Sequence, residues 1–364
     1  MKRILHILGS LNQGGAETYI LRYMNFDHDN EHYVLCHQGI TGPLEPEYRK
    51  RTKRIITNIR FYYCFGNYIR FIKFLKKEGI DTIWNGDGSI MFFLAKIAGV
   101  KNRILFYRTS AREIHNDRFY IRRLYSWLNC NLSAHFATRV LSNSQTALDN
   151  FHPNHKYVNS NKYKVIYNGI DCSYISQKTK CQIREMLGIP INAFVVGHSG
   201  RLNPAKNHEM IIKTAISLCR QYDDIYFVLM GLNVDTEYQK LIDDEKLQDK
   251  IRLLGYRKDV MDILQGLDLF YFPSIREGNP NALIEAMVSG IPIVASNINP
   301  IIECVPNYLV NQLVSPSDFN KNKEAISCLY LHRDKLSDLT CAEWAKKKFD
   351  AETQFLMFKK ELEA

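Results

Sequence analysis

The sequence lacks the patterns that define several common classes of protein. No window approaches the ~20 consecutive apolar residues that a membrane-spanning helix requires. The nine cysteines include no Cys-x-x-Cys pair and no tight cluster with histidine, and their number is odd. These absences argue against a membrane span, a zinc site and a disulfide framework. We therefore expect reduced thiols in a cytoplasmic protein.

Two signatures of nucleotide and metal binding are also missing. The turn after the first apolar run, from Gly9 to Glu17, does not have the Gly-x-Gly-x-x-Gly spacing of a dinucleotide site. No Asp-x-Asp pair stands where a bridging Mg²⁺ would be needed, so neither a metal nor a cofactor is expected. Gly14 and Gly15 instead permit an acceptor or a diphosphate to approach the backbone closely.

The patterns that are present indicate a two-domain α/β protein. At 364 residues the chain exceeds the size at which one hydrophobic core usually keeps growing. Apolar runs of strand length alternate with segments of helix length, which is typical of doubly wound sheets. The predicted strands are Arg3–Leu8, Tyr33–His37, Thr82–Trp84, Arg103–Tyr107, Arg139–Ser142, Lys164–Tyr167, Phe194–Ser199, Tyr226–Met230, Arg252–Leu254, Leu269–Phe272 and Ile293–Ala295.

The apolar pattern also suggests where the domains end. It loosens over residues 169–193, which we interpret as a linker. The sequence thus predicts one Rossmann-like domain over residues 1–170 and a second over residues 171–342. The remaining segment, residues 343–364, has aromatic residues at helical spacing and is predicted to be a helix.

Residues 269–296 combine a strand, a polar turn, a helix and a second strand in one short unit. The apolar strand is interrupted by Gly278, Asn279 and Pro280. Asn279 is a suitable N-cap, and Pro280 is a suitable first helical residue. A glycine turn that opens a helix places unpaired N–H groups and the positive end of the helix dipole at the carboxyl edge of the sheet. The unit therefore predicts an anion site.

Two acids flank this turn, Glu277 in the loop and Glu285 in the helix. Acidic residues on helices are mostly exposed, so one interpretation is that Glu277 caps the helix and Glu285 is solvated. The neighbours of Glu285 are too apolar for a solvated stripe. We therefore expect the two acids to reach different parts of one extended ligand.

A second anion site is predicted where the second half of the chain begins. Gly200 ends the strand Phe194–Ser199, and a helix is expected to start near Asn207. Arg201 and Lys206 project from the intervening loop beside the start of that helix. Two charges with nearby backbone donors suit a diphosphate, although a solvated basic pair would give the same pattern.

The unit that contains both acids resembles the E-x₇-E signature of retaining GT-B glycosyltransferases of family 4, whose pattern is EGxPxxxxEAxxxGxPVxAS. The resemblance implies an α/β GT-B fold, in which two Rossmann-like domains face each other across a cleft and residues 343–364 cross back to the N-terminal domain. It implies that Glu277 contacts the transferred sugar and that Glu285 holds the ribose. The turn that would donate N–H groups to the sugar and the diphosphate is formed by Gly278, Asn279, Pro280 and Asn281.

Two further segments are similar to the same family. The loop with Arg201 and Lys206 resembles its GR(L/F)xxxKN segment, which implies that both side chains bind the donor's phosphates. With Glu277 they would form the catalytic set, because they neutralise the leaving group as the sugar–phosphate bond breaks. Gly14 and Gly15 lie in a turn that resembles the N-terminal GGAE loop of these enzymes.

One more segment matches the family, at the predicted base pocket, and one segment departs from it. The segment LLGYRKDV resembles the FLGxxxDV loop, which places the base beside Tyr256 and Arg257. Many members have a histidine that contacts the donor sugar after the strand that corresponds to Arg103–Tyr107. This chain has FYRTSAREIHNDR there, so Arg108 and His115 are the weaker candidates for that role.

The charge balance favours an anionic partner. The chain has 48 Lys and Arg against 38 Asp and Glu, a formal net charge of +10. Residues 49–77 interleave basic and aromatic side chains, which suits an interfacial membrane patch. A nucleic-acid surface would use the same residue types, and a core helix over Ile69–Leu75 with a solvated basic face is the third interpretation.

These observations favour a retaining, metal-independent glycosyltransferase. The expected donor is a nucleoside diphosphate hexose or N-acetylhexosamine, with UDP favoured over GDP. The expected acceptor is a saccharide, lipid-linked at the inner face of the plasma membrane, as in the synthesis of capsule, O-antigen or exopolysaccharide. Nucleic acid is not an expected partner. The alternatives are a sugar- or nucleic-acid-binding protein without catalysis and a nucleotide-sugar epimerase of the same fold.

Overall fold

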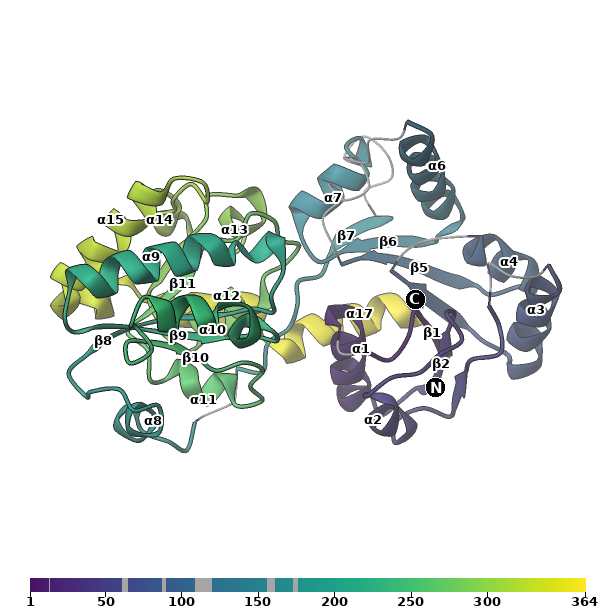
Figure 1. Ribbon diagram of the computed structural model, residues 1–364. Helices are drawn as coiled ribbons and strands as arrows, with labels where there is room; N and C mark the ends of the chain where they lie inside the picture. Colours follow the sequence, from purple (N-terminus) through teal and green to yellow (C-terminus); the bar gives the residue numbers. More distant parts are fainter. Residues whose placement is uncertain (13, 61–64, 87–89, 109–119, 156–160, 173–175) are drawn as a thin grey trace. The chain divides into compact units, whose positions relative to one another are not determined.

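The chain divides into two units, each built on one parallel sheet (Figure 1). The computed structural model describes residues 1–364 except residues 13, 61–64, 87–89, 109–119, 156–160 and 173–175, and it describes residues 120–126 by their backbone. The first unit comprises Met1–Gly169 and Ala351–Ala364, and the second comprises Ile170–Asp350.

The first unit contains a seven-stranded sheet in the order β3-β2-β1-β4-β5-β6-β7. Every pair of neighbouring strands is parallel. The strands are β1 (Arg3–Leu8), β2 (Glu31–Cys36), β3 (Arg54–Ile56), β4 (Thr82–Asn85), β5 (Asn102–Tyr107), β6 (Arg139–Ser142) and β7 (Tyr163–Val165). The helices are α1 (Gly15–Phe26), α2 (Glu45–Arg49), α3 (Gly66–Glu78), α4 (Met91–Ala98), α6 (Tyr120–Phe136), α7 (Gln145–Phe151) and α17 (Ala351–Glu363).

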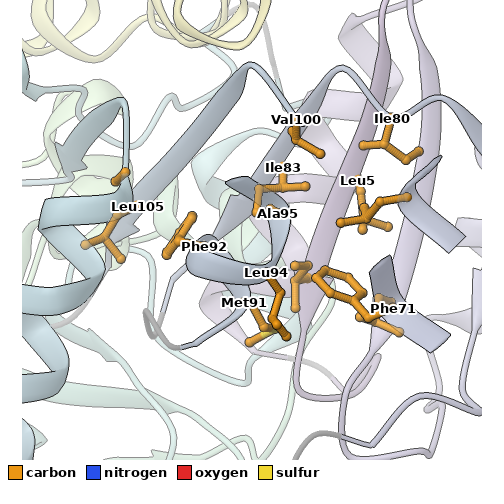
Figure 2. Packing of buried hydrophobic residues seen from close by; sticks show 14 of the residues in the cluster. Leu5, Phe71, Ile80, Ile83, Met91, Phe92, Leu94, Ala95, Val100 and Leu105 are labelled. Carbon is orange, nitrogen blue, oxygen red and sulfur yellow. The ribbon is translucent and has the colours of Figure 1, made fainter. Parts of the chain in front are cut away.

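Helices cover both faces of this sheet, because its strands are apolar on both sides. One hydrophobic cluster joins the sheet to α3, α4, α6 and α7. Figure 2 shows part of that cluster, in which Phe71 of α3 and Phe92 of α4 pack with Leu5, Ile83 and Leu105 of the strands. A second cluster joins the opposite face to α1 and α17.

The second unit contains a five-stranded parallel sheet in the order β10-β9-β8-β11-β12. The strands are β8 (Phe194–Ser199), β9 (Ile225–Met230), β10 (Ile251–Leu253), β11 (Leu269–Phe272) and β12 (Ile293–Ala295). The helices are α8 (Lys180–Met186), η2 (Pro204–Lys206), α9 (His208–Gln221), α10 (Val234–Asp244), α11 (Val260–Leu264), α12 (Asn281–Val288), α13 (Asn299–Ile302), α14 (Asn307–Val310), α15 (Phe319–Leu331), η3 (Arg333–Leu339) and α16 (Ala342–Phe349).

The predicted α/β class and all eleven predicted strands are confirmed, and one strand was missed. That strand, β3 (Arg54–Ile56), has three residues and pairs only with β2 at the edge of the sheet. The strand has only two apolar residues, Ile55 and Ile56, and they follow the basic residues Lys53 and Arg54. So short an apolar run beside charged residues is typical of an edge strand and gives a weak strand signal.

The end of the chain differs from the single helix expected over residues 343–364. The chain bends at Asp350 (φ −54°, ψ 126°), which separates α16 from α17. The helix α16 packs on α12 within the second unit, whereas α17 packs within the first. In the first unit, Asn102 donates from Nδ2 to the carbonyl of Glu361 at 2.7 Å, and Thr82 donates from Oγ1 to the carbonyl of Leu362 at 2.7 Å.

The interpretation of residues 169–193 as a loose linker is wrong for its second half. Residues Lys180–Met186 form α8, which opens with a capping box between Thr179 and Gln182. Arg184 of α8 is buried, and its guanidinium donates to Asp268 Oδ2 at 2.6 Å and to the carbonyl of Gly266 at 3.0 Å. A buried guanidinium with these partners fixes α8 to the second unit.

The part of the chain that the structure describes also bears on the expected absence of a membrane span and on the state of the cysteines. None of its helices combines the length and apolar content of a membrane span. The eight cysteines there are all free, and five of them are buried: Cys36, Cys130, Cys219, Cys304 and Cys341.

Replacing Phe358 by alanine tests whether α17 is part of the first unit's core. Phe358 is fully buried and its ring lies 4.9 Å from that of Tyr23, centroid to centroid. We expect Phe358→Ala to lower the free energy of unfolding of the first unit by roughly 3–5 kcal/mol. In calorimetry of the whole chain, only the transition of that unit should move down.

The neighbouring exposed residue gives a matched control. Met357 is on the same helix but 43% exposed, so Met357→Ala should change neither transition by more than ~0.5 kcal/mol. An equal loss from both substitutions, or a shift confined to the second unit, would contradict the assignment of α17 to the first unit's core.

Candidate active site

The second unit has a topological switch between β8 and β11. From β8 the chain builds the sheet in one direction through β9 and β10, and it then returns to the other side of β8 as β11. Connections that leave adjacent parallel strands in opposite directions open a crevice at the carboxyl ends of those strands, where ligands bind. The loops that follow β8 and β11 carry the anion-site residues predicted from the sequence.

Lys206 and Glu277 meet at this switch. The Nζ atom of Lys206 lies 2.7 Å from Oε1 of Glu277 and 5.0 Å from the ring centroid of Phe272. The side chain of Glu277 is 9% exposed and that of Lys206 is 22% exposed. The sequence predicted both residues but not their ion pair, which balances two partly buried charges.

Backbone and amide contacts hold the two loops together. Ile275 donates its backbone N–H to the carbonyl of Ala205 at 2.8 Å. The side-chain amide of Asn207 donates to the carbonyl of Pro273 at 3.0 Å and to that of Pro316 at 2.8 Å. Asn207 adopts φ 60° as it opens α9, a conformation that asparagine tolerates better than most residues. These bonds fix the separation of Lys206 from the start of the β11–α12 loop.

The helix α12 begins later than predicted. Its first residue is Asn281 and its N-cap position is Pro280, so Pro280 is not the first helical residue and Asn279 is not the N-cap. Asn279 is buried, and its Nδ2 atom lies 3.1 Å from Sγ of Cys304. The amide thus has a structural partner that the sequence could not indicate. No side chain caps α12.

The remaining predicted residues of this unit differ in exposure. Glu285 is partly buried on α12, and four of its close neighbours on the helix are fully buried: Leu283, Ile284, Ala286 and Met287. Gly278 and Asn281 are also partly buried, in the turn and the first turn of α12. Arg201 is exposed beside Gly200 at the end of β8, and no described residue forms an ion pair with it.

The predicted base-binding loop follows β10. Tyr256 is 53% exposed. The Nε and Nη2 atoms of Arg257 donate to the two carboxylate oxygens of Asp259 at 2.8 and 2.6 Å. This bidentate pair occupies the Nε and Nη2 donors of Arg257. A base placed here would therefore contact backbone groups and Tyr256 rather than those two donors.

Sequence reasoning missed Gly231, which follows β9 directly. Its N–H donates to the carbonyl of Gly255 at 2.7 Å, and a Cβ atom at Gly231 would collide with the carbonyl of Gly200. Glycine is therefore required for the loops after β8, β9 and β10 to approach each other. The signal was available, because Gly200, Gly231 and Gly255 each follow a predicted strand within two residues.

His198 was also missed. It is fully buried on β8, and its Nδ1 atom lies 2.9 Å from the carbonyl of Tyr271, so Nδ1 carries the proton. Burial, with the neighbouring His208 ring, lowers the pKa of His198 to about 3. Its Nε2 atom has no protein partner and points toward Gly200. The imidazole is thus a neutral acceptor beneath the loop that carries Arg201.

The first unit has its own switch point, between β1 and β4, and Gly14 and Gly15 follow β1 there. Gly14 is the N-cap of α1 and Gly15 is its first residue, and no side chain caps the helix. Arg108 follows β5, where its guanidinium stacks 3.7 Å from the ring centroid of Tyr19. His115 lies outside the described residues.

The Arg108 guanidinium has few hydrogen-bond partners in the protein. Its Nη2 atom donates to Oδ1 of Asn168 at 2.7 Å, while Nε and Nη1 are buried without a hydrogen-bond partner. Burial lowers the pKa of Arg108 to about 10. Buried donors without partners are costly, which suits a residue that binds an anion.

Taken unit by unit, these groups can bind a phosphorylated ligand at the carboxyl edges of two parallel sheets. The second unit contributes two basic side chains, an uncapped helix start and two acids. Two Rossmann-like units with such groups at their sheet edges are typical of nucleotide-binding α/β proteins. The chain also matches known families over most of its length: residues 180–346 match glycosyl transferases group 1, and residues 13–174 match glycosyltransferase family 4.

Individual relatives agree with these matches. The chain is 28% identical to the capsular polysaccharide biosynthesis glycosyltransferase CapH of Staphylococcus aureus, over 88% of this chain and 86% of CapH. It is 30% identical to the UDP-Gal:alpha-D-GlcNAc-diphosphoundecaprenol alpha-1,3-galactosyltransferase of Escherichia coli, over 66% of this chain and 64% of that enzyme. The crystal structure of Anabaena HepE in complex with UDP superposes with a TM-score of 0.79 at 20% identity and covers 100% of both chains. The chain belongs to the group 1 glycosyltransferases and has the GT-B fold.

The low pKa of His198 predicts that the second unit loses stability in mild acid. The unfolded chain binds a proton near the ordinary histidine pKa of 6.5, whereas the folded chain binds it only near pH 3. Stability is therefore lost as the pH falls from 6.5 toward 3. Between pH 7 and pH 5, His198 should cost about 2 kcal/mol of the free energy of unfolding.

His198→Gln should remove about that much of the acid sensitivity, measured by urea unfolding of the whole chain at both pH values. The exposed His332 of the same unit supplies the control, and His332→Gln should leave the acid sensitivity unchanged. If both variants kept the wild-type pH dependence, His198 would not be held neutral by the fold.

Proposed function

We propose that this glycosyltransferase moves a hexose or an N-acetylhexosamine from a UDP-sugar to a saccharide on a lipid carrier, with retention of the anomeric configuration. A GDP-sugar is the alternative donor. The product would be an intermediate of capsule, O-antigen or exopolysaccharide synthesis, made at the inner face of the plasma membrane. The Lys206–Glu277 pair at the switch between β8 and β11 carries the proposal.

The pair supports a transferase because it joins an anion-binding group to a sugar-binding group. A bound diphosphate would compete with Glu277 for the Nζ atom of Lys206. The released carboxylate would then accept a hydrogen bond from a sugar hydroxyl, while Lys206 and Arg201 stabilise charge on the leaving diphosphate. Glu277 is thus proposed to orient the sugar, and no covalent intermediate on it is required.

Glu285 is proposed to hold the ribose from its partly buried position on α12. The start of α12, with Gly278 and Asn281, would donate N–H groups to the phosphates. From the first unit, Arg108 is proposed to bind an anionic group of the donor or acceptor, because its two buried nitrogens lack protein partners. The step needs no metal in this proposal, since positive side chains and helix dipoles face the diphosphate.

The names of the relatives support the lipid-linked acceptor and the UDP donor. The Escherichia coli relative uses UDP-Gal and a diphosphoundecaprenol-linked sugar, and the Staphylococcus aureus relative serves capsular polysaccharide synthesis. Transfer to a soluble oligosaccharide is the competing outcome, and it would be read from the acceptor that becomes labelled.

Ligand-linked thermal stabilisation should identify the donor and separate the two acids. Each nucleotide among UDP, GDP and ADP, with and without its sugar, is added at about 100-fold its Kd, where binding stabilises by ~2.7 kcal/mol. We expect Glu285→Ala to abolish the shift given by the correct nucleotide. Glu277→Ala should retain that shift and lose the extra shift given by the attached sugar.

The exposed Glu324 on α15 supplies the control, because Glu324→Ala removes a carboxylate outside the site. It should respond to every ligand as the wild type does. Equal responses of all three variants would contradict the assigned roles of Glu277 and Glu285.

The stereochemical outcome is a separate prediction. The proton spectrum of a product made from a donor of α configuration should show a new α-linkage. A β-linkage would contradict retention and would require the acceptor hydroxyl to attack from the face opposite the diphosphate.

A further inference from the structure

The positive charge of this protein is concentrated in the first unit. That unit has 27 Lys and Arg against 15 Asp and Glu, whereas Ile170–Asp350 has 21 against 23. The donor-phosphate residues Arg201 and Lys206 belong to the second unit, so they do not account for the excess. An excess of this sign favours an anionic partner for the first unit.

One face of the first unit also exposes large apolar side chains. Helix α4 turns Met91, Phe92, Leu94 and Ala95 inward to the core shown in Figure 2. On its outer side, Ile90, Phe93 and Ile97 follow one another at helical spacing and are 40–51% exposed.

The adjacent helix α6 continues the apolar surface. It buries Cys130 and Ala134, while Trp127, Leu128 and Leu132 are 43–55% exposed. The ring of Phe93 on α4 lies 5.1 Å from that of Phe136 on α6, centroid to centroid, which joins the two exposed rows. We call these six exposed residues of α4 and α6 the α4–α6 strip: Ile90, Phe93, Ile97, Trp127, Leu128 and Leu132.

The charged side chains of the described helices that form and border this strip are mostly basic. The sequences of α4 and α6 contain no acidic residue. Helix α3, which packs beside α4, has one acid, Glu78, and this acid pairs with Arg54 at 3.1 Å. Four basic residues of α3 are exposed: Arg70, Lys73, Lys76 and Lys77. Three of them, with Arg54, border a depression of about 240 Å³ at the β3 edge: Arg70, Lys73 and Lys77.

This surface differs from the membrane patch expected over residues 49–77. In α3, Phe71 and Leu75 are buried in the core, so the helix is a core helix with a basic outer face, as the third interpretation had it. The exposed apolar side chains of that stretch in the described residues are Phe65 and Ile69, at the start of α3. The helices α4 and α6 supply the larger apolar area.

We infer that the α4–α6 strip docks onto an anionic lipid bilayer, with the strip in the interfacial region and the basic face of α3 against the headgroups. Tryptophan and aliphatic side chains favour that region, and a row of Lys and Arg is attracted to acidic lipids. Lys96, between Phe93 and Ile97, can extend its amine past them to the phosphates. The inference complements the proposed lipid-linked acceptor, but vesicle binding needs neither donor nor acceptor.

A second copy of the chain is a poorer occupant. A twofold dimer through the strip would place the same face of each copy together, and with it two rows of basic residues without intervening acids. Like charges at such an interface oppose association. An acidic bilayer has the opposite charge and an apolar interior, so it matches both parts of the surface.

Flotation of the full chain with vesicles tests the inference. We expect binding to vesicles of phosphatidylglycerol and phosphatidylcholine, weaker binding to phosphatidylcholine alone, and a decrease at high salt. The double variants Phe93→Ser with Ile97→Ser, and Trp127→Ser with Leu132→Ser, should each reduce partition at least about tenfold. Lys73→Gln with Lys77→Gln should reduce mainly the salt-sensitive part.

The matched control removes two exposed leucines from the second unit, as Leu241→Ser with Leu331→Ser, and should bind as the wild type does. Thermal unfolding checks that each variant is folded. Because there are two strip variants, the test can still be made if one of them fails to fold. Donor-dependent transfer to a soluble acceptor is measured in parallel, so a failure of docking and a failure of the transferase are distinguished.

Three results would overturn the inference. The first is a wild-type chain that does not float with anionic vesicles. The second is strip variants, folded and monomeric, that bind vesicles as well as the control does. The third is a wild-type dimer in sedimentation velocity that the strip substitutions convert to monomers, which would assign the surface to a second copy.

Discussion

The ion pair between Lys206 and Glu277 is the contact on which the candidate site depends. It joins the loops after β8 and β11, which are adjacent strands, although Lys206 and Glu277 are 71 residues apart in the chain. Removing one member of a partly buried pair such as this leaves the other charge without compensation. Anything that separates the loops therefore exposes an unbalanced charge.

The supporting contacts explain why the loops stay together. Asn207 holds the β11–α12 loop and the segment at Pro316 through its side-chain amide, and Ala205 accepts the N–H of Ile275. Beneath them, His198 remains neutral because burial opposes its protonation. The loops that carry Arg201 and Lys206 thus lie over a buried, uncharged imidazole.

The two units differ in net charge. The second unit has nearly balanced charge, and two of its basic residues, Arg201 and Lys206, lie in the loop after β8. The first unit has a large positive excess and exposes both an apolar strip and a basic helix face. Under the function proposed above, the second unit would bind the water-soluble donor and the first unit would face the membrane that carries the acceptor.

Much of this protein could be read from its sequence. Buried parallel strands are continuous apolar runs, so eleven strands were found, and the glycine turns marked the loops that carry Glu277 and Lys206. Short-range chemistry also gave the start of α9 near Asn207. These features depend on neighbours in the chain, which is why the sequence by itself determined them.

Only the tertiary structure decided which groups meet. The pairing of Lys206 with Glu277, the burial of Asn279 against Cys304 and the bend at Asp350 each depend on residues that are far apart in the chain or on packing between elements. The same holds for the exposed apolar side chains: the sequence indicated residues 49–77, but packing buried Phe71 and left Phe93 and Trp127 exposed. Helical periodicity gives two faces, and only the packed neighbours determine which face meets solvent.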